Sequence, residues 1–431
     1  MKRIIDLKRE LTDALRVGWF LGVRQIRRSS KGTTTLIISI MVLTFLNLVV
    51  VSGLLLGLIS GSFEAFKQSY SGEMIITTAP QLDHIEHSAD LISFLRSHPR
   101  VTALSARHVA GAEILGTLTD LPGKNEQPNK ISMQVVGIEP VEEEIVTRFS
   151  RFVVEGEMLD ENEDGYMLIG ANMIKEYSSF ADANIPGITL LTNVRVGTRV
   201  RVSLASADGP VRKDFIVKGI VKSKVDQIST RAFINDRELK RMIPVNKEEV
   251  QEIAVKTDDS FASTLVAETT AFTGPDVARI QTSAEAIPSF LRDIEMTMGI
   301  LGNALSSFAL IVASITIFIV VFINAVTKRK FIGIMKGIGI SPLAIEISYI
   351  FQALFYGIVG SVVGLVLVFA FLKPYFDAYP INFPFSDGIL VATYGSAFLR
   401  VAILLVVTLL AGYVPAKLIV RKNTLDSILG R

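Results

Sequence analysis

The sequence predicts a membrane α-helical protein with four transmembrane helices and an α+β extracytoplasmic domain inserted between helices 1 and 2. Long uncharged apolar runs, an uneven distribution of lysine and arginine, and a soluble composition between the first two runs predict this class. A mean hydropathy of +0.44 is too high for an ordinary soluble enzyme, whereas 20% charged residues argue against a wholly embedded chain. The net charge of +2 gives no reason to expect nucleic acid as a partner.

The first uncharged run, residues 33–60, is long enough to cross the bilayer, because about 20 apolar residues span a hydrocarbon core of about 30 Å. In residues 1–32, apolar side chains recur at helical spacing opposite arginines. They are Leu11, Leu15, Trp19, Val23 and Ile26. This pattern predicts an amphipathic helix along the inner leaflet; the alternative is an extension of the first transmembrane helix whose arginines reach water.

Three further runs complete the set of spans. Residues 296–327 exceed the length that a span needs, so this helix should tilt or project as a stalk. The third span covers residues 343–373 and the fourth residues 389–418. Arg400 interrupts the fourth, and we place it near the outer interface or facing protein, because a charge at the bilayer centre costs roughly 2.5–3.5 kcal/mol.

Lysine and arginine concentrate in residues 1–32, 328–342 and 419–431. The short connection 374–388 instead carries Asp377 and Asp387. Since basic residues favour the cytoplasmic side, both termini should be cytoplasmic, and residues 61–295 and 374–388 should be outside.

Residues 61–295 read as an α+β domain in which two βαβ-like halves flank a mostly β insertion. For the halves we predict strands at 73–78, near Val101, at 252–256 and at 277–281, with helices at 89–97 and 261–270. For the insertion we predict strands at 132–138, 166–169, 199–204 and 215–221.

Known catalytic motifs are missing from the sequence. There is no G-x-x-x-x-G-K-[ST], so this chain should not hydrolyse ATP alone, and there is no G-x-S-x-G or H-E-x-x-H. His84 and His87 beside Asp83 and Glu86 would suit a metal, or simply a polar helix start. Residues 160–165 match the start of a calcium loop, but Ala171 stands where a bidentate Glu is needed, which favours a polar turn. No catalytic residue and no metal site are expected.

The connection between the second and third spans carries more information. In KRKFIGIMKGIGISP, residues 328–342, helical spacing of Phe331, Ile334 and Ile338 ends at Gly339 and Pro342. This pattern predicts a short cytoplasmic helix parallel to the membrane. Joined to two spans, such a helix would pass motion from a cytoplasmic partner outward; the alternative is a basic turn that only satisfies topology.

This segment resembles the coupling segment of permeases in the FtsX and MacB-type group of ABC transporters, with its I-G-I-L-K-A-I-G-A-S-P pattern. The resemblance implies that the ATPase contact is made by Lys328, Arg329, Lys330, Phe331, Gly333, Ile334, Lys336, Gly337, Ile338, Gly339, Ser341 and Pro342. Residues 411–428, AGYVPAKLIVRKNTLDSI, also resemble the family ending, although Thr424 stands where the family often has Pro. Residues 135–140 and 156–170 resemble family strands and turns more weakly.

The resemblance implies a permease in the inner membrane that pairs with a second copy or paralogue and recruits a separate cytoplasmic ATPase. That ATPase would bind ATP and Mg²⁺, so no cofactor is expected in this chain. The layout most resembles lipoprotein-releasing permeases, and Gln352 favours that comparison, which makes a lipoprotein or periplasmic protein a further partner.

The polar residues Asn47, Asn303, Ser306 and Ser307 are candidates for a substrate cavity, or only pack helices. The competing function is a mechanotransmission or signalling protein that regulates an envelope hydrolase without transport.

Overall fold

The computed structural model describes residues 2–116, 129–178, 189–205, 209–243, 248–274, 276–383, 386–388 and 390–420. The chain forms two compact units. The helical unit comprises residues 1–59, 293–381 and 388–431, and the α+β unit comprises residues 60–292 and 382–387. Each unit has apolar clusters of its own.

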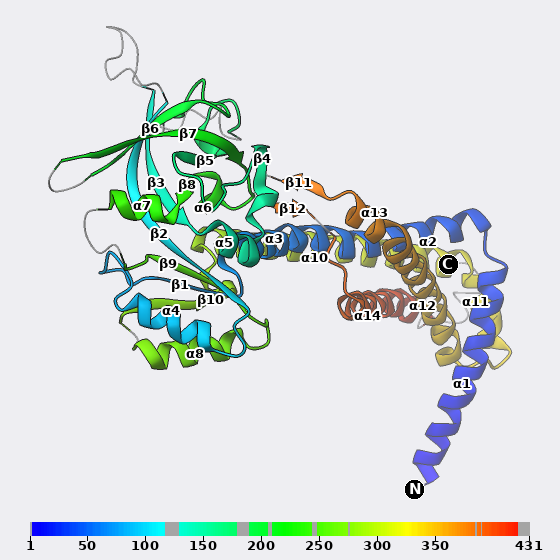
Figure 1. The fold of residues 1–431 in the computed structure, drawn as a ribbon. Coiled ribbons are helices and arrows are strands. Elements are labelled where there is room, and N and C mark those ends of the chain that lie inside the picture. Colours follow the sequence, from blue (N-terminus) through cyan, green and yellow to red (C-terminus); the bar gives the residue numbers. More distant parts are fainter. Residues whose placement is uncertain are drawn as a thin grey trace. The chain divides into compact units, whose positions relative to one another are not determined.

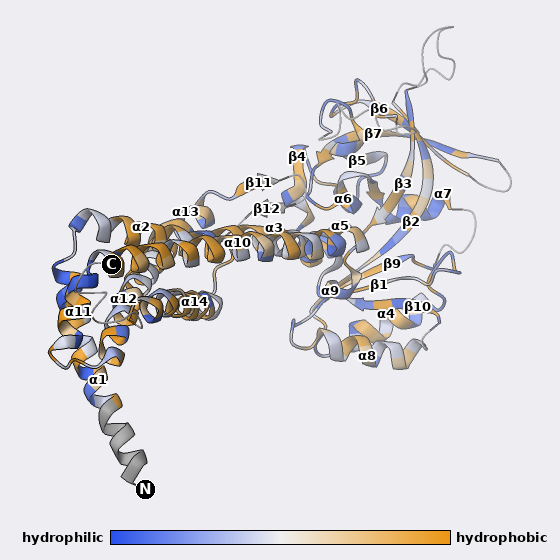
Figure 2. Ribbon diagram, turned by 180° about the vertical axis from the view of Figure 1, so that it is seen from behind, coloured by the Kyte–Doolittle hydropathy of each residue, from blue (hydrophilic) through white to orange (hydrophobic). Residues whose placement is uncertain are grey.

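Within the described residues, four apolar helices are long enough to cross a membrane: Lys31–Ser71, Ser289–Thr327, Pro342–Ala378 and Tyr394–Leu418. Figure 2 shows their hydrophobic colouring. The first joins α2 (Lys31–Leu46), the π-helical turn η1 (Asn47–Val51), α3 (Ser52–Phe66) and a second π-helical turn, η2 (Lys67–Ser71). The second is α10 (Ser289–Thr327). The third joins α12 (Pro342–Leu367), η5 (Val368–Leu372) and α13 (Lys373–Ala378), and the fourth is α14 (Tyr394–Val420).

Several helix boundaries differ from the predicted ones; the second helix begins at Ser289, not at residue 296, and the third runs to Ala378, not to residue 373. The first helix continues beyond residue 60, because the charged residues Glu64 and Lys67 do not break a helix; it ends where Gly72 adopts a positive φ of 62°. The fourth helix begins at Tyr394, not at residue 389. Thr393 marks this start, since its Oγ1 accepts a hydrogen bond from the Ser396 amide at 3.3 Å.

Glycines on α12 allow the helices of the helical unit to pack closely. A Cβ added at Gly360 would lie 2.4 Å from Met41 of α2, and one at Gly364 would lie 2.4 Å from Phe45. On another side of α12, Gly357 faces Leu405 of α14. Small residues serve this purpose in membrane helices, where close backbone approach replaces hydrophobic burial as the main attraction.

The amphipathic segment is a helix of its own, α1 (Lys2–Arg27), and does not extend α2, which begins at Lys31. It packs on α12 through Gly18 and Gly22, whose added Cβ atoms would lie 2.6 Å from Ile347 and 3.1 Å from Ser348. Leu11, Leu15 and Trp19 are exposed.

One part of the α+β unit is a four-stranded region with the order β10-β1-β9-β2. It contains β1 (Met74–Thr78), α4 (Ser88–Ser97), β2 (Ala103–Leu115), β9 (Glu252–Lys256), α8 (Ala262–Thr273) and β10 (Ala278–Thr282). Helices α4 and α8 lie on one face of these strands (Figure 1). The two predicted βαβ-like halves therefore interleave, because β9 lies between β1 and β2 as in a split βαβ arrangement.

The insertion forms the other part. Its strands are β3 (Lys130–Ile138), β4 (Val153–Gly156), β5 (Tyr166–Gly170), β6 (Arg199–Leu204), β7 (Val211–Val221) and β8 (Ala232–Asn235). Pairing runs from β2 through β3, β8, β5, β7 and β6 back to β2, so these strands close into a barrel around an apolar core.

Several short elements were not predicted. They are β4, β8, α5 (Pro140–Thr147), η3 (Phe149–Phe152), η4 (Ala171–Met173), α6 (Asp226–Ser229), α7 (Asp236–Met242), α9 (Ser283–Ala286), β11 (Ile381–Phe383) and β12 (Ser386–Gly388).

Candidate functional site

The predicted coupling segment contains a helix, α11 (Arg329–Gly337), with a defined stop at each end. Lys328 separates it from α10 with φ −95° and ψ 12°. After α11, Gly339 adopts a positive φ of 93°, which a side chain would disfavour. Ser341 then caps α12, since its Oγ accepts from the Ala344 amide at 3.2 Å, and Pro342 occupies the first helical position.

Two faces of α11 differ sharply in exposure. Ile332 is 1% exposed and lies in the core of the helical unit, and Gly333 is buried beside it. Phe331, Ile334 and Ile338 are exposed by 67%, 51% and 72%. We call these three residues the α11 apolar face; it lies between the exposed cations Arg329 and Lys330 and the exposed Gly339 and Ser341.

Lysine 336 attaches α11 to a third helix. Its Nζ donates a hydrogen bond of 2.9 Å to the carbonyl oxygen of Val420, at the end of α14. Met335 and Ile340 pack against the same apolar cluster as Ile332. The helix is thus joined by the chain to α10 and α12 and by a side chain to α14, so a force on its outer face acts on all three.

The candidate cavity residues are only partly brought together. Ser306 Oγ lies 3.0 Å from Ser52 Oγ, a hydrogen bond between α10 and α3 that fits the helix-packing alternative. Asn303 and Ser307 are exposed on α10, and Ser307 donates to the Asn303 carbonyl at 2.8 Å. Asn47 begins η1, and its Oδ1 is buried without a hydrogen-bond partner among the residues that the structure describes. None of the four lines either cavity described below.

Two other polar residues of the spans face protein. The Arg400 guanidinium donates a hydrogen bond of 3.3 Å to the carbonyl oxygen of Val49 in η1, so it faces protein, one of the two expected placements. Gln352 is buried on α12 and donates from Nε2 to the Tyr356 hydroxyl at 2.9 Å.

A buried ion pair lies in the α+β unit where β2 passes from one part to the other. Residues Ala103–Arg107 of β2 pair with β9, and residues His108–Leu115 pair with β3. At that step Arg107 donates to both carboxylate oxygens of Glu143 on α5, at 2.7 and 2.8 Å, and to the Tyr70 carbonyl at 2.9 Å. The next residue, His108, pairs with Asp236 of α7 at 2.6 Å.

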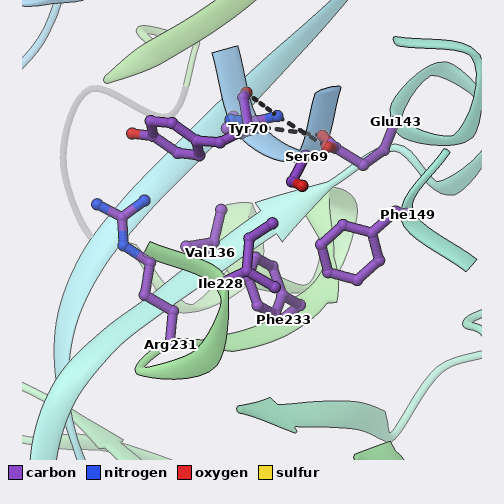
Figure 3. A pocket seen from close by; sticks show the side chains of 9 residues that line it. Ser69, Tyr70, Val136, Glu143, Phe149, Ile228, Arg231 and Phe233 are labelled. Carbon is purple, nitrogen blue, oxygen red and sulfur yellow. Dashed lines mark hydrogen bonds and ion pairs between the residues drawn. The ribbon is translucent and has the colours of Figure 1, made fainter. Parts of the chain in front are cut away.

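A second ion pair lies beside the first. We call Tyr70, Arg107, His108, Glu143, Arg231, Asp236 and Glu252 together the junction network. Arg231, just before β8, lies 3.0 Å from Glu252 of β9, and Glu252 also lies 3.7 Å from Arg107. The Tyr70 ring is 5.0 Å from the Arg107 guanidinium and 5.6 Å from that of Arg231. Tyr70, Arg107, Glu143 and Arg231 are among the residues that line a cavity of about 10 Å³, room for roughly one water molecule (Figure 3).

Burial would raise the pKa of the Glu143 carboxyl group, yet its pKa is lowered. The charge of Arg107 and hydrogen bonds from Arg107, Ser105 and Thr147 outweigh the cost of burial. Nothing in the sequence spacing connects Tyr70, Arg107, Glu143 and Arg231. A consecutive Arg107 and His108 inside an apolar strand was the one available signal.

The two weak metal patterns are used in other ways. Asp164 of the calcium-like turn forms ion pairs with Arg237 and Arg241 of α7, and Gly165 has a positive φ of 82°, as a polar turn before β5 requires. His87 precedes α4, whose first residue, Ser88, donates to Glu249 at 2.7 Å. Within the described ranges, no group of three His, Cys, Asp or Glu residues is placed to hold a metal ion.

Two solved structures are similar to about half of this chain. The periplasmic region of MacB from Actinobacillus actinomycetemcomitans is 13% identical over 50% of this chain and 91% of its own, with a TM-score of 0.31. The extracellular domain of the noncanonical ABC-type transporter YknZ from Gram-positive bacteria is 14% identical over 48% of this chain and 99% of its own, also with a TM-score of 0.31. No curated protein matches the chain.

A family model matches residues 303–424, the part of the chain that contains most of α10 and all of α11, α12 and α14. Its description is FtsX-like permease C-terminal. The resemblance predicted from the coupling segment is thereby confirmed, because residues 303–424 match the FtsX-like permease C-terminal family.

Proposed function

We propose that this chain is the permease subunit of an ABC transporter in the inner membrane, coupling ATP hydrolysis by a separate ATPase to movement of an extracytoplasmic α+β unit. The α11 apolar face carries the proposal. A monomeric protein seldom leaves three large apolar side chains together in water, and on a helix that faces the cytoplasm they suit burial by a partner.

Chain connectivity gives a route for the motion. α10 precedes α11 and is joined to it through Lys328. Its 39 residues make a helix roughly 58 Å long at 1.5 Å per residue. At its other end, α10 follows α9, which is fixed to β10 by a capping box between Thr282 and Glu285. A displacement of α11 would therefore be carried along one helix to an edge strand of the α+β unit.

The proposed ATPase subunit would supply the nucleotide-binding site that this sequence lacks. No phosphate-binding loop occurs in the sequence, so nucleotide and Mg²⁺ would be bound by the ATPase subunit. A second permease copy or paralogue would complete the complex, in keeping with the family of residues 303–424.

For the substrate we propose an amphiphile, with release of acylated lipoproteins as the leading case. In support, α10 exposes Asn303 and Ser307 on the same helix as exposed Ile300 and Leu301, so polar and apolar groups are presented together. The competing function, mechanotransmission to an envelope hydrolase, uses the same coupling without release. Reconstituted vesicles separate the two, because only a transporter should release an acylated lipoprotein when ATP is added.

The coupling assignment is tested by replacing Ile334 and Ile338 with Asp. Both side chains are more than half exposed, so the variant should fold, whereas new carboxylates buried against the ATPase would weaken docking. We expect ATPase co-purification from membranes to fall at least about tenfold, the change that 1.4 kcal/mol of binding energy produces.

A matched control is Val141→Asp with Ile145→Asp on α5. This pair also introduces two carboxylates four residues apart at exposed apolar positions, with exposures of 56% and 49%. ATPase co-purification should be unchanged in the control. Full ATPase binding and full ATP-dependent function of the Ile334 and Ile338 variant would show that the segment is only a basic turn.

A further inference from the structure

A second cavity of the α+β unit, of about 220 Å³, opens beside the end of the first candidate span. Its lining includes Glu64 near the end of α3, Lys67 at the start of η2 and Glu73 just before β1. Arg148 and Arg151, at and after the end of α5, and Lys256 of β9 also line it. Four cations and two carboxylates thus line the cavity.

The lysines and carboxylates already have partners. Lys67 Nζ lies 2.6 Å from Asp259 and 3.7 Å from Glu73, and Lys256 Nζ donates to the Ile145 carbonyl at 2.8 Å. Glu64 accepts a hydrogen bond from Gln68 at 2.6 Å. These groups need no ligand to balance them.

Arg148 and Arg151 differ in this respect. Both are exposed, and within the described residues neither guanidinium has an acidic partner. Arg148 holds the left-handed conformation, φ 52° and ψ 48°, which turns the chain from α5 into η3. A cation at a helix carboxyl end is favoured by the helix dipole, and this accounts for Arg148; Arg151 lies beyond the helix and has no such explanation.

The other lining residues indicate what the cavity would take. A guanidinium forms paired hydrogen bonds with a phosphate group, and two of them are available here. Val146 and Phe152 add apolar wall, and Val141 and Ile145 of α5 expose further apolar surface. Charge and apolar surface side by side match a ligand that has both an anionic head and an apolar part.

We propose that this cavity binds the phosphate head group of an amphiphilic ligand, with Arg148 and Arg151 as the residues that contact the phosphate. The proposal goes beyond the leading case of the proposed function, because the lipid anchor of an acylated lipoprotein carries no phosphate, and it rests on the proposed function only for the presence of a membrane lipid. Its test needs no ATPase. The head-group proposal can therefore fail while the ATPase-coupling proposal stands, and the ATPase-coupling proposal can fail while the head-group proposal stands.

The test titrates the purified full-length chain, in dodecyl maltoside, with dihexanoyl phosphatidylglycerol by calorimetry. The variant is Arg148→Asn with Arg151→Gln; Asn tolerates the left-handed conformation better than most residues, so the turn after α5 should survive. We expect its affinity to fall roughly tenfold or more relative to the unmodified chain, since two charge-assisted contacts are lost.

The control removes the same charge outside the cavity, with Arg199→Gln and Arg212→Gln, two exposed residues on β6 and β7. Its affinity should stay within about twofold, because only bulk attraction changes. If Arg148→Asn with Arg151→Gln does not fold, Arg151→Gln alone should still weaken binding several-fold.

Titration with inorganic phosphate distinguishes free phosphate from a lipid head group as the ligand. It should bind at least about tenfold more weakly than the lipid, because it lacks the apolar part. Equal affinity for phosphate and lipid would overturn the head-group assignment. Unchanged lipid affinity in the cavity variants, or equal losses in the control, would overturn the site itself.

Discussion

At the scale of residues, the junction network shows how a long strand can belong to two parts of one unit. Arg107 is the last residue of β2 that pairs with β9, and its guanidinium binds Glu143 on α5, an element of the inserted part. A buried ion pair adds little net stability over apolar packing, but breaking it is costly because an unpaired charge stays buried. Such a pair can therefore fix the relative placement of β2 and α5, the elements that supply it.

Glu143 provides the test of this network. Replacing Glu143 with Gln should lower the free energy of unfolding at pH 7 by about 3–5 kcal/mol, because Arg107 loses its hydrogen-bonded carboxylate and keeps only Glu252 at 3.7 Å, which already pairs with Arg231. The folded-state pKa of Glu143 lies below its unfolded value, so its stabilisation is complete above about pH 4.5 and is lost as the pH falls through the folded pKa. The deficit of the variant, measured by thermal unfolding of the purified chain, should shrink in acid.

Glu113→Gln is the matched control, because Glu113 pairs with Lys130 at 2.8 Å on the exposed surface of β2 and β3. Exposed pairs of this kind contribute about 0–1 kcal/mol. A Glu143 variant no less stable than the Glu113 variant, or a deficit that does not vary with pH, would show that the buried pair carries no special weight.

Sequence spacing predicted which candidate residues share a face when they lie on one element. The α11 apolar face follows from the positions of Phe331, Ile334 and Ile338, because a helical period fixes which side chains share a face. Asn47, Asn303, Ser306 and Ser307 were grouped by type and by expected depth, and the structure pairs only Ser306 with another span, through Ser52. Contacts between distant segments depend on packing, which spacing does not encode.

At the scale of elements, α1 depends on close contact between two helix backbones. Gly18 has room for no side chain, because an added Cβ would lie 2.6 Å from Ile347 and 2.8 Å from the Ala344 carbonyl oxygen of α12. Gly18→Leu should therefore displace α1 from α12. We expect faster trypsin cleavage at Arg16 and Arg24 and a thermal midpoint several degrees lower, as overpacking that costs 1–3 kcal/mol would produce.

Gly32→Leu controls for the loss of a glycine from this region, since the nearest neighbour of its added Cβ is the Ser30 hydroxyl at 3.9 Å. Trypsin cleavage should be unchanged in that variant. Equal cleavage of the Gly18 variant and the unmodified chain would mean that α1 does not need its contact with α12.

Elements were predictable in proportion to their length and regularity. The apolar runs gave the four long helices, and alternation gave strands close to β1, β3, β5, β6, β7, β9 and β10. β4 and β8 have four residues each, too few for alternation to distinguish them from loop. The interleaving of the two βαβ-like halves and the closure of the barrel could not be predicted, because strand pairing joins residues far apart in the chain.

At the scale of the whole molecule, the distribution of charge predicts how the chain crosses the membrane. Basic residues precede α2, occupy α11 and its start, and follow α14, whereas the connection after α12 carries Asp377 and Asp387. Four crossings satisfy all of these preferences at once. Moving residues 328–342 to the other side would place Lys328, Arg329, Lys330 and Lys336 outside.

Reporter fusions decide this topology. Alkaline phosphatase, which is active only outside the cytoplasm, should be active when inserted at Gly209, where an added Cβ meets no atom within 4 Å and an insertion should therefore be tolerated. The same reporter fused after Arg431 should be silent, because the basic C-terminal tail should remain cytoplasmic. A cytoplasmic fluorescent reporter at Arg431 serves as the expression control and should be bright. A Gly209 fusion that is stably expressed but inactive would show that the α+β unit faces the cytoplasm, and α11 would then lie on the wrong side to meet an ATPase.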